Sequence, residues 1–429
     1  MRTWTNKRIL ITQSSLFSIA GSEVVAYELA GFFAGKGAQV TVVTCGFSGT
    51  WEEHFSTLPN TTLLRLDDPC LDARITADPP DYAWIQHQVI PVTLLRNPGS
   101  TIFLFHHMSA FLPQEFPLDH RVESALASAV LFPAQESLEV QRASGLLEEV
   151  SHDRLAVLGN PAPEHFWVPS PPTRTRMRRV LLVSNHIPEE LAAAISSLPP
   201  DCEVVVRGEE RSRGAVSQLV QPEELAGADT IISIGKTVQY ALAAGVPVYC
   251  YDRFGGPGWL GPDNVVLARH NNFSGRGFAS RSAEDIAAEL HLGFAKAAID
   301  AAELHRTIGP EFLLNVAIER VLSTLKPHSI RPLSEPDLVA FGLRQEVTNG
   351  LTNALAARNM TVTAHEMTID DVYTRLSLSE AKAAQLDTEV LRLTAEVQRI
   401  ESVPGLRMAR VLRNRFIAVK TRLMGRASR

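Results

Sequence analysis

The chain has 429 residues, which is too many for one ordinary hydrophobic core, so two domains with appendages are expected. With 45% hydrophobic and 21% charged residues, its composition is typical of a water-soluble globular protein. The formal net charge of −6 argues against a chain that binds nucleic acid over its whole length.

The cysteines and the N-terminal segment bear on where the chain is found. The four cysteines, none in a CxxC pair, are Cys45, Cys70, Cys202 and Cys250. Reduced thiols in a cytosolic protein are therefore expected. No apolar run reaches the roughly 18 residues that a membrane span needs. The apolar stretch Ile9–Ile11 is interrupted by Thr12 and Gln13, so no cleaved signal peptide is expected.

Short apolar segments alternate with helical or loop segments over the first part of the chain. A strand at 8–12, a polar loop of small residues and a helix over 23–35 open a doubly wound parallel sheet. The predicted strands are 8–12, 40–44, 62–66, 101–105, 129–132 and 155–158. We expect a Rossmann-like domain over residues 1–165.

A proline-rich, basic stretch at 160–179 interrupts this alternation and is interpreted as an inter-domain linker. A second α/β alternation then predicts another Rossmann-like domain over 176–326. Its expected strands are 180–183, 203–206, 230–234 and 246–251, and its expected helices are 189–198, 237–244, 283–297 and 300–325. Two such domains in series leave a cleft between them, where α/β sheets bind ligands.

The sequence changes character after the second domain. A proline-containing linker at 327–336 leads into a helical linker at 337–370. Over 371–402, apolar residues alternate at four- and three-residue intervals, which predicts a coiled coil. The seam consists of Val372, Leu376, Ser379, Ala383, Leu386, Val390, Leu393, Val397 and Ile400. Residues 403–429 form a basic, weakly amphipathic tail.

The most informative motif is the turn Gly235-Lys236-Thr237, between an apolar strand and a helix. Backbone N–H groups at such a helix start bind anions, and the Lys236 ammonium adds positive charge beside them. A Walker A loop needs a glycine at position 230, where the chain has Thr230. The turn predicts a site for a phosphate-bearing ligand, with a solvated surface lysine as the alternative.

The start of the first long helix is a second candidate ligand contact. Gly21 and Ser22 lie there, and a glycine allows a ligand to approach the backbone closely. A simple turn glycine is the alternative. No GxGxxG is present at this turn after the first strand, which disfavours a dinucleotide cofactor and an NAD-dependent oxidoreductase. Asn185, after the strand 180–183, is expected to face the cleft from the second domain.

His106 and His107 directly follow the strand 101–105, at the carboxyl end of the first sheet. A histidine there binds a hydroxyl or phosphate group or transfers a proton, so both are candidate catalytic residues, with a structural role as the alternative. Arg276 is a candidate phosphate ligand or an ordinary surface arginine. No His, Cys or Asp cluster has metal-ligand spacing, so no metal is expected.

Several segments carry a resemblance to a known family. They are SIAGSEVVAYELAGFFAGKGAQVTVVT (18–44), LAVLGNPAPEHF (155–166) and GKTVQYALAAGVPV (235–248). Over residues 8–325 the chain resembles the GT-B glycosyltransferases, in particular the family 4 group of retaining, nucleotide-sugar-dependent enzymes. The segments SNHIPEEL and NFSGRGF resemble a subgroup found among bacterial surface-polysaccharide proteins. The donor motif is divergent, because the family's paired glutamates fall on Ile232 and Tyr240.

The resemblance implies an α/β chain of the GT-B fold, with two Rossmann-like domains facing a cleft. It implies that residues 1–165 form the acceptor-side domain and residues 176–326 the domain that binds the nucleotide-sugar donor. It implies a hexosyltransferase that moves a sugar, with retention, from a nucleotide-sugar donor to a cell-surface polysaccharide or a lipid-linked glycan. Neither a metal nor any other cofactor is expected. The candidate donor-binding residues are Gly21, Ser22, Asn185, Gly235, Lys236, Thr237, Tyr240 and Arg276. Because both glutamates are missing, the alternative is a catalytically inactive GT-B scaffold in glycan assembly.

The basic tail suggests where the protein works. Residues 405–429 contain seven arginines and Lys420 but no acidic residue. Such a segment is attracted to anionic lipid surfaces, and a coiled-coil dimer would carry two copies of it. We expect a cytoplasmic homo-oligomer, bound peripherally to the inner membrane face. A solvated or disordered tail is the alternative.

Overall fold

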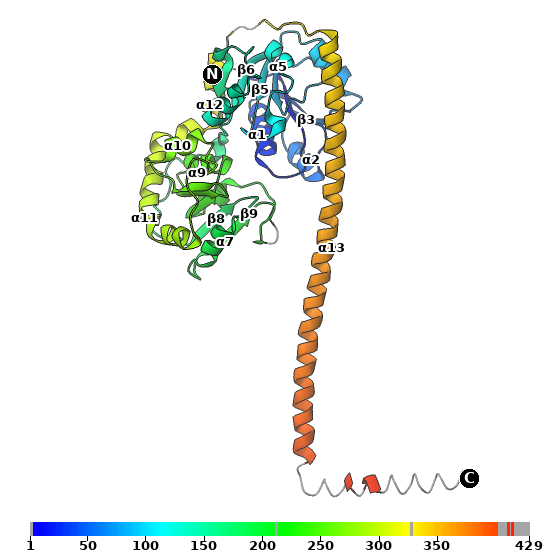
Figure 1. The fold of residues 1–429 in the computed structure, drawn as a ribbon, viewed down its shortest axis with the longest axis vertical. Coiled ribbons are helices and arrows are strands. Elements are labelled where there is room, and N and C mark those ends of the chain that lie inside the picture. The colour runs from blue at the N-terminus through cyan, green and yellow to red at the C-terminus, as the bar shows by residue number, and fades with distance from the viewer. Residues whose placement is uncertain (1–2, 211–212, 327–328, 402–409, 412, 416–429) are drawn as a thin grey trace, which may run out of the picture. The chain divides into compact units, whose positions relative to one another are not determined.

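A computed structural model of the chain describes residues 3–210, 213–326, 329–401, 410–411 and 413–415. The chain forms two compact units, Met1–Ala354 and Leu355–Arg429. The first unit contains two β-sheets with helices packed around them (Figure 1).

The first sheet has seven parallel strands in the order β3-β2-β1-β4-β5-β6-β7. The strands are β1 (Arg8–Gln13), β2 (Gln39–Thr44), β3 (Thr61–Arg65), β4 (Tyr82–Gln86), β5 (Ile102–His106), β6 (Ala127–Phe132) and β7 (Leu155–Val157). Successive residues of β1 face opposite sides, because Ile9 and Ile11 pack in one apolar cluster and Leu10 in another. The strand order reverses between β1 and β4, and such a switch point leaves a crevice at the carboxyl ends of the strands.

Helices cover both faces of this sheet. They are α1 (Gly21–Gly35), α2 (Gly49–Ser56), α3 (Leu71–Ala77), α4 (Val92–Arg96), α5 (His120–Leu126) and α6 (Gln135–Ala143), with 3-10 turns at Pro113–Glu115, His152–Arg154 and Glu164–Phe166. In α1, Val25, Leu29 and Phe33 recur every four residues and are buried against the sheet. This apolar stripe fixes which face of α1 packs against the sheet.

The second sheet has five strands in the order β12-β11-β10-β8-β9. They are β8 (Arg179–Val183), β9 (Glu203–Arg207), β10 (Thr230–Ser233), β11 (Val248–Asp252) and β12 (Gly255–Trp259). The first four are parallel, and β12 runs antiparallel to β11 at the edge. The helices are α7 (Glu189–Ser196), α8 (Pro222–Ala226), α9 (Lys236–Ala244), α10 (Val265–His270) and α11 (Ala283–Thr307). Two facing Rossmann-like sheets are the arrangement of the GT-B fold, as expected from the sequence.

The chain crosses between the two sheets twice. After α11, a 3-10 turn at Gly309–Phe312 leads to α12 (Leu314–Thr324). Ala317 and Val321 of α12 pack in the apolar cluster of the first sheet. The two crossings are joined to each other, because Ala162 N donates to Phe312 O at 2.7 Å and Leu314 N donates to Ala162 O at 2.8 Å.

Three elements differ from the pattern expected from the sequence. The strand β4 was not predicted, because all five of its residues are buried and it lacks the alternation of a half-exposed strand. The edge strand β12 was not predicted either, since its sequence, GGPGW, contains almost no strand-forming side chains. The predicted break at 298–299 is wrong. Helix α11 continues to Thr307 and ends before Pro310, which cannot extend it.

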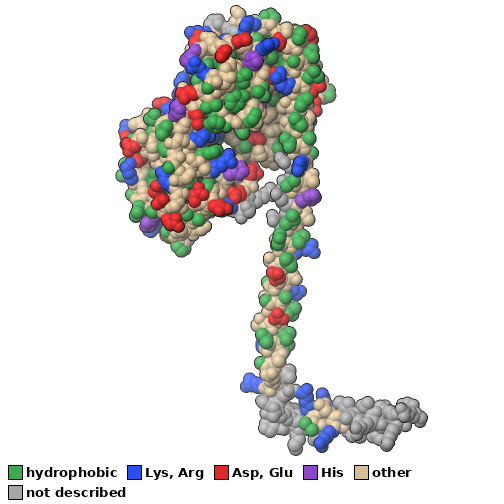
Figure 2. Space-filling model, in the orientation of Figure 1, with side chains coloured by type: hydrophobic (Ala, Val, Ile, Leu, Met, Phe, Trp, Pro, Cys, Tyr) green, Lys and Arg blue, Asp and Glu red, His purple; other side chains and the backbone are tan. Residues whose placement is uncertain are grey.

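The last helix, α13 (Glu335–Glu401), runs through both units. In the first unit, Leu338 and Phe341 pack in the core of the first sheet, and the Gln345 side chain forms two hydrogen bonds with the Ile90 backbone. In the second unit, apolar side chains lie exposed along the helix (Figure 2). Within the described part of the chain, every helix is too short or too polar to cross a membrane.

Part of the predicted C-terminal region lies outside the described residues. The side chains of Val397 and Ile400, at the end of the predicted seam, belong to this group. Of the predicted basic tail at 403–429, the structure describes residues 410–411 and 413–415.

Candidate functional site

A cavity of about 800 Å³ lies between the two sheets of the first unit. Its walls come from the loop and helix after β1, the loop after β5, and the segments after β8, β9, β10 and β11. These are the carboxyl ends of the strands, where α/β sheets bind ligands. Seven residues predicted to bind the donor line this cavity: Gly21, Ser22, Asn185, Gly235, Lys236, Thr237 and Tyr240.

Three other predicted site residues, His106, His107 and Arg276, are not among the residues that line the cavity. Arg276 forms a bidentate ion pair with Glu136 of α6, with Nε–Oε1 at 2.8 Å and Nη2–Oε2 at 2.5 Å. Its guanidinium also lies 4.7 Å from the centre of the Phe111 ring. In this arrangement Arg276 holds the second domain to the first, outside the cavity.

His106 is the last residue of β5 and is only 1% exposed. Its Nδ1 accepts a hydrogen bond from Trp84 Nε1 at 3.2 Å. Burial lowers the pKa of His106 to about 3, because a charged imidazole is poorly solvated there. The ring is therefore a neutral part of the core of the first domain.

His106 gives the fold a predictable sensitivity to acid. Its folded pKa lies below the ordinary value of 6.5, so its contribution to stability is complete above pH 6.5 and is lost as the pH falls toward 3. In His106→Gln this part of the pH dependence is expected to vanish. Thermal unfolding midpoints of both proteins, measured from pH 7 to 4, check this. Equal slopes in the two proteins would show that another group is responsible.

His107 forms an ion pair with the Glu123 carboxylate of helix α5, which packs against the first sheet. Its Nε2 lies 2.9 Å from Glu123 Oε1 of α5, and its ring stacks on Phe132. Burial lowers the pKa of His107, but the charge and hydrogen bond of Glu123 outweigh it, so the pKa is raised. The pair fastens α5 to the sheet and does not reach the cavity.

The start of α9 is the best anion-binding feature of the cavity. Gly235 has φ +60° and ψ −122°, a conformation open to glycine but not to other residues. Its N–H donates to Phe273 O at 3.0 Å. This turn places the first N–H groups of α9, beginning with those of Lys236 and Thr237, at the cavity wall without partners inside the helix. Such groups, together with the helix dipole, bind phosphate.

The Lys236 ammonium, however, already has partners in this structure. Its Nζ lies 2.5 Å from Glu28 Oε2 of α1, donates to Pro161 O at 3.2 Å, and lies 5.0 Å from the Tyr240 ring centre. Both charged side chains are 10% exposed. Burial lowers the pKa of Lys236 and raises that of Glu28, while their mutual attraction opposes both shifts. Lys236 therefore joins the two domains as well as lining the cavity.

Tyr240 lies one turn after Lys236 and binds the same carboxylate. Its hydroxyl donates to Glu28 Oε1, and its ring stacks on Phe166 at a centroid distance of 4.1 Å and an interplanar angle of 7°. The Glu28 carboxylate thus contacts two side chains of α9, the Lys236 ammonium and the Tyr240 hydroxyl. A carboxylate is present beside position 240 after all, but it comes from the first domain.

The start of α1 differs from that of α9 in charge. Glu23 caps it, accepting from Ala20 N and from Ser18 Oγ, both at 3.0 Å. This carboxylate makes the helix start a poorer site for a phosphate. Next to it, a Cβ on Gly21 would meet no atom within 4 Å, so Gly21 borders open space. The α1 start is better suited to a neutral part of a ligand.

The remaining charged groups of the cavity are also largely paired. Arg207, at the end of β9, lies 2.5 Å from Glu224. Asp252, at the end of β11, is 9% exposed, and burial raises the pKa of its carboxyl group. Among the described lining residues, the two strong cations, Lys236 and Arg207, are therefore both neutralised by carboxylates. The free N–H groups of α9 are left as the cavity's positive end.

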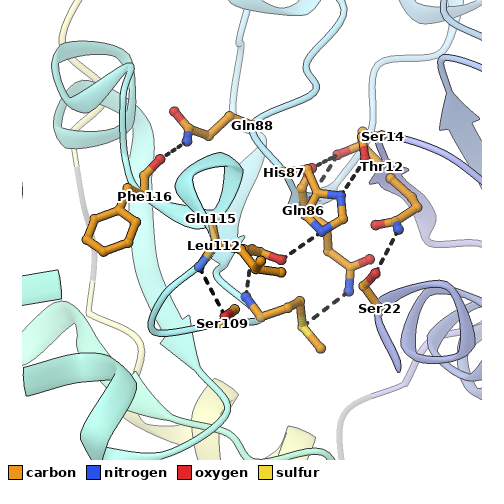
Figure 3. Close-up of polar contacts among 12 residues, drawn as sticks. Thr12, Ser14, Ser22, Gln86, His87, Gln88, Ser109, Leu112, Glu115 and Phe116 are labelled. Atoms are coloured by element: carbon orange, nitrogen blue, oxygen red, sulfur yellow. Dashed lines mark hydrogen bonds and ion pairs between the residues drawn. The ribbon is translucent and has the colours of Figure 1, made fainter. Parts of the chain in front are cut away.

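A polar chain that the sequence did not predict lies at the switch point of the first sheet (Figure 3). Ser14, just after β1, has its Oγ 2.6 Å from Nδ1 of His87, just after β4. His87 Nε2 lies 2.8 Å from Glu115 Oε1, and Glu115 Oε2 accepts from Met108 N at 2.8 Å. Glu115 lines the cavity, and the nearby His87 charge holds its pKa low in spite of burial. The missed signal was β4, whose end positions His87.

In the described ranges, no cluster of three or more His, Cys, Asp or Glu side chains is arranged to hold a metal ion.

No protein-family model and no curated protein matches the sequence. Solved structures do match the fold. HepE of Anabaena in complex with UDP has a TM-score of 0.50 and 16% identity, covering 74% of this chain and 99% of HepE. HepE in complex with UDP and glucose has a TM-score of 0.49 and 14% identity, covering 75% of this chain and 99% of HepE. WaaG, a glycosyltransferase involved in lipopolysaccharide biosynthesis, has a TM-score of 0.41 and 11% identity, covering 74% of this chain and 100% of WaaG. At such identities the likeness shows the fold alone.

Proposed function

We propose that this chain is a glycosyltransferase that moves a hexose from a nucleotide-sugar donor to a cell-surface polysaccharide or a lipid-linked glycan. The observation that carries the proposal is the cavity, in which unpartnered N–H groups of α9 and the Lys236 ammonium lie opposite the first domain. A diphosphate fits the wall formed by the start of α9, and a sugar fits the less positive wall that the first domain forms opposite it.

The proposed chemistry follows from these charges. As the bond between the anomeric carbon and the diphosphate breaks, negative charge develops on the leaving oxygen. The N–H groups at the start of α9 are fixed in place to stabilise that charge, and Lys236 adds to it once the diphosphate shares it with Glu28. The family resemblance implies retention of configuration, which proton NMR of the first-formed product would test. No step is assigned to His106 or His107, since both lie outside the cavity lining.

A nucleotide screen with one matched pair of glycine variants tests the proposal. UDP, which HepE binds in its solved complex, is compared with GDP, ADP and UDP-glucose by thermal shift. At about a hundred times its Kd, a ligand stabilises the fold by roughly 2.7 kcal/mol. Gly21→Ala fills open space in the cavity and is expected to weaken binding about tenfold, or roughly 1.4 kcal/mol.

Gly35→Ala is the control for that screen. Gly35 lies at the other end of α1, outside the cavity lining, and its Cβ would also meet nothing within 4 Å. It is expected to leave both stability and binding unchanged or slightly improved. If no nucleotide shifts the melting temperature of the wild-type protein, the glycosyltransferase proposal is wrong.

A non-catalytic GT-B scaffold is the second candidate. It is favoured by the pairing of Tyr240 and Lys236 with Glu28, which occupies the groups expected to meet the donor. The two candidates differ in turnover. A scaffold would bind a nucleotide sugar without releasing nucleoside diphosphate, with or without acceptor glycans.

The C-terminal helix supports a further part of the proposal, a dimer bound to the membrane. In the described part of the predicted seam, Leu386, Val390 and Leu393 are 58%, 58% and 47% exposed in a single chain. A second α13 would cover this stripe by coiled-coil packing. The tail at 403–429 would then contact anionic lipids, with each basic residue near the surface contributing about 1 kcal/mol.

Deleting 403–429 is expected to abolish flotation of the protein with vesicles containing phosphatidylglycerol. The seam variant Leu386→Lys/Val390→Lys keeps the tail but loses the dimer, so it is expected to bind the same vesicles more weakly than wild type. Light scattering reports the oligomeric state of each protein. Unchanged flotation after the deletion would remove the tail from the proposal, and a dimeric seam variant would remove the coiled coil.

A further inference from the structure

The wall of the cavity opposite α9 is supported by a second layer of polar side chains. Three lining residues are each held from behind by a residue at a strand end. The side chain of Gln13 donates to Ser22 Oγ at 3.0 Å, that of Gln86 approaches Met108 Sδ at 3.8 Å, and His87 holds Glu115. Figure 3 shows Ser22, Gln86, His87 and Glu115 gathered at this place.

The backbone at His87 is held in an unusual conformation. His87 and Gln88 have φ of +50° and +53°, in the left-handed region that residues other than glycine rarely adopt. Gln88 is fixed there by its side chain, which donates to Phe116 O and accepts from Asp119 N at 2.9 Å. Such strain persists where the surroundings impose it and is concentrated at ligand-binding sites. Here it turns His87 toward Glu115.

Glu115 has unused capacity to accept hydrogen bonds. A carboxylate offers about four lone-pair positions; Met108 N donates to one oxygen, and His87 Nε2 lies 2.8 Å from the other. The layer behind it also contains acceptors. Of the described polar atoms, Gln13 Oε1 and Gln86 Oε1 are buried and have no hydrogen-bond partner. These two glutamines do not line the cavity, so the acceptor that a ligand can reach here is the Glu115 carboxylate, and the group that complements it is a donor.

We infer that Glu115 binds a hydroxyl group of the donor's sugar and thereby selects neutral sugars over sugars that carry a carboxylate. His87 is the positioning residue, since it fixes the carboxylate without lining the cavity itself. A second carboxylate brought to this wall would face Glu115 at short range with little water between them, which is costly. The inference rests on the proposed function and names the class of sugar transferred.

The experiment compares two ligands that differ only at C6 of the sugar. UDP, UDP-glucose and UDP-glucuronate are titrated calorimetrically into the full-length protein. The wild type is expected to bind UDP-glucose at least about tenfold more tightly than UDP-glucuronate. Glu115→Gln is expected to bring this ratio to about twofold while the Kd for UDP changes by less than about twofold.

Two more variants separate positioning from a general effect on the fold. His87→Gln is expected to weaken UDP-glucose about fivefold and leave UDP unchanged, because the carboxylate loses its orientation. Glu139→Gln removes a carboxylate that faces a histidine, His270, at 3.5 Å outside the cavity lining, and is expected to keep the wild-type ratio. If Glu115→Gln does not fold, His87→Gln decides.

The outcomes separate this inference from the proposed function. If UDP binds but the wild type does not discriminate between the two sugars, or Glu115→Gln keeps the full discrimination, the assignment of Glu115 is wrong and the transferase proposal stands. If GDP binds in place of UDP, GDP-mannose and GDP-mannuronate replace the uridine pair. If no nucleoside diphosphate binds, both proposals fail together.

Discussion

Replacing Glu28 by glutamine is expected to destabilise the fold and yet strengthen nucleotide binding, whereas Lys236→Met is expected to weaken both. The two charges face each other at 2.5 Å and are largely buried. Removing one partner of a buried pair leaves the other without compensation, which costs about 3–5 kcal/mol. Glutamine still offers Tyr240 a hydrogen-bond acceptor, so the effect of Glu28→Gln is mainly electrostatic.

The opposite effects on binding follow from competition for one ammonium group. A diphosphate at the start of α9 has to share Lys236 with Glu28. Without the Glu28 carboxylate, the lysine is free for the ligand, and the Kd for UDP is expected to fall about tenfold, a change of roughly 1.4 kcal/mol. Without Lys236, the ligand meets a buried carboxylate, and the Kd is expected to rise by at least about the same factor.

A thermodynamic cycle completes this test. The double variant Glu28→Gln/Lys236→Met removes both charges and is expected to recover most of the lost stability, which gives a large coupling energy. The exposed pair Arg269–Glu311, at 2.9 Å and 40% and 46% exposed, is the control, and Glu311→Gln is expected to cost at most about 1 kcal/mol. Urea midpoints measure stability and calorimetry measures binding. If Glu28→Gln weakens UDP binding, the competition does not exist.

Gly235→Ala is expected to have the second largest effect, a loss of nucleotide binding together with reduced stability. At φ +60° and ψ −122°, an alanine would have to leave this conformation, at a cost of about 1–3 kcal/mol. The turn would then move, breaking the bond from Gly235 N to Phe273 O and shifting the first N–H groups of α9. Because the proposed diphosphate site consists of these groups, we expect binding of UDP to fall by at least about tenfold.

The other end of the same helix provides the control. Gly245 caps α9 with φ +65°, and a Cβ there would lie 2.5 Å from Pro171 Cγ, outside the cavity lining. Gly245→Ala is therefore expected to lower the melting temperature by a similar amount and to leave the Kd of the folded protein unchanged. Equal losses of binding in both variants would mean that α9 is only generally destabilised.

The turn at 235–237 could be predicted from the sequence because its signal is local. An apolar strand, a glycine and a helix follow one another there, and the structure places that helix start at the cavity wall. The two-domain α/β architecture could be predicted for the same reason, since alternating segments of the right length specify it. The position of a residue at the end of a strand was also predictable for Asn185.

Pairing between distant residues could not be predicted in this way. Tyr240 and Glu28 are 212 positions apart, and only the meeting of α1 and α9 brings them together. His106 does lie at a strand end, but its ring is buried and accepts a hydrogen bond from Trp84 instead of lining the cavity. His87 was missed because β4, which is buried on both faces, shows no alternating pattern. A single sequence carries no direct signal for any of these three.

The paired crossings between the two sheets tie the two domains to each other. Ala162 bonds to both Phe312 and Leu314, so the outgoing and returning strands of chain form one short ribbon between the domains. The second domain is in this sense an insertion into the first, whose core is completed by α12. Cutting the chain once, anywhere between the sheets, would therefore not release two independent folding units.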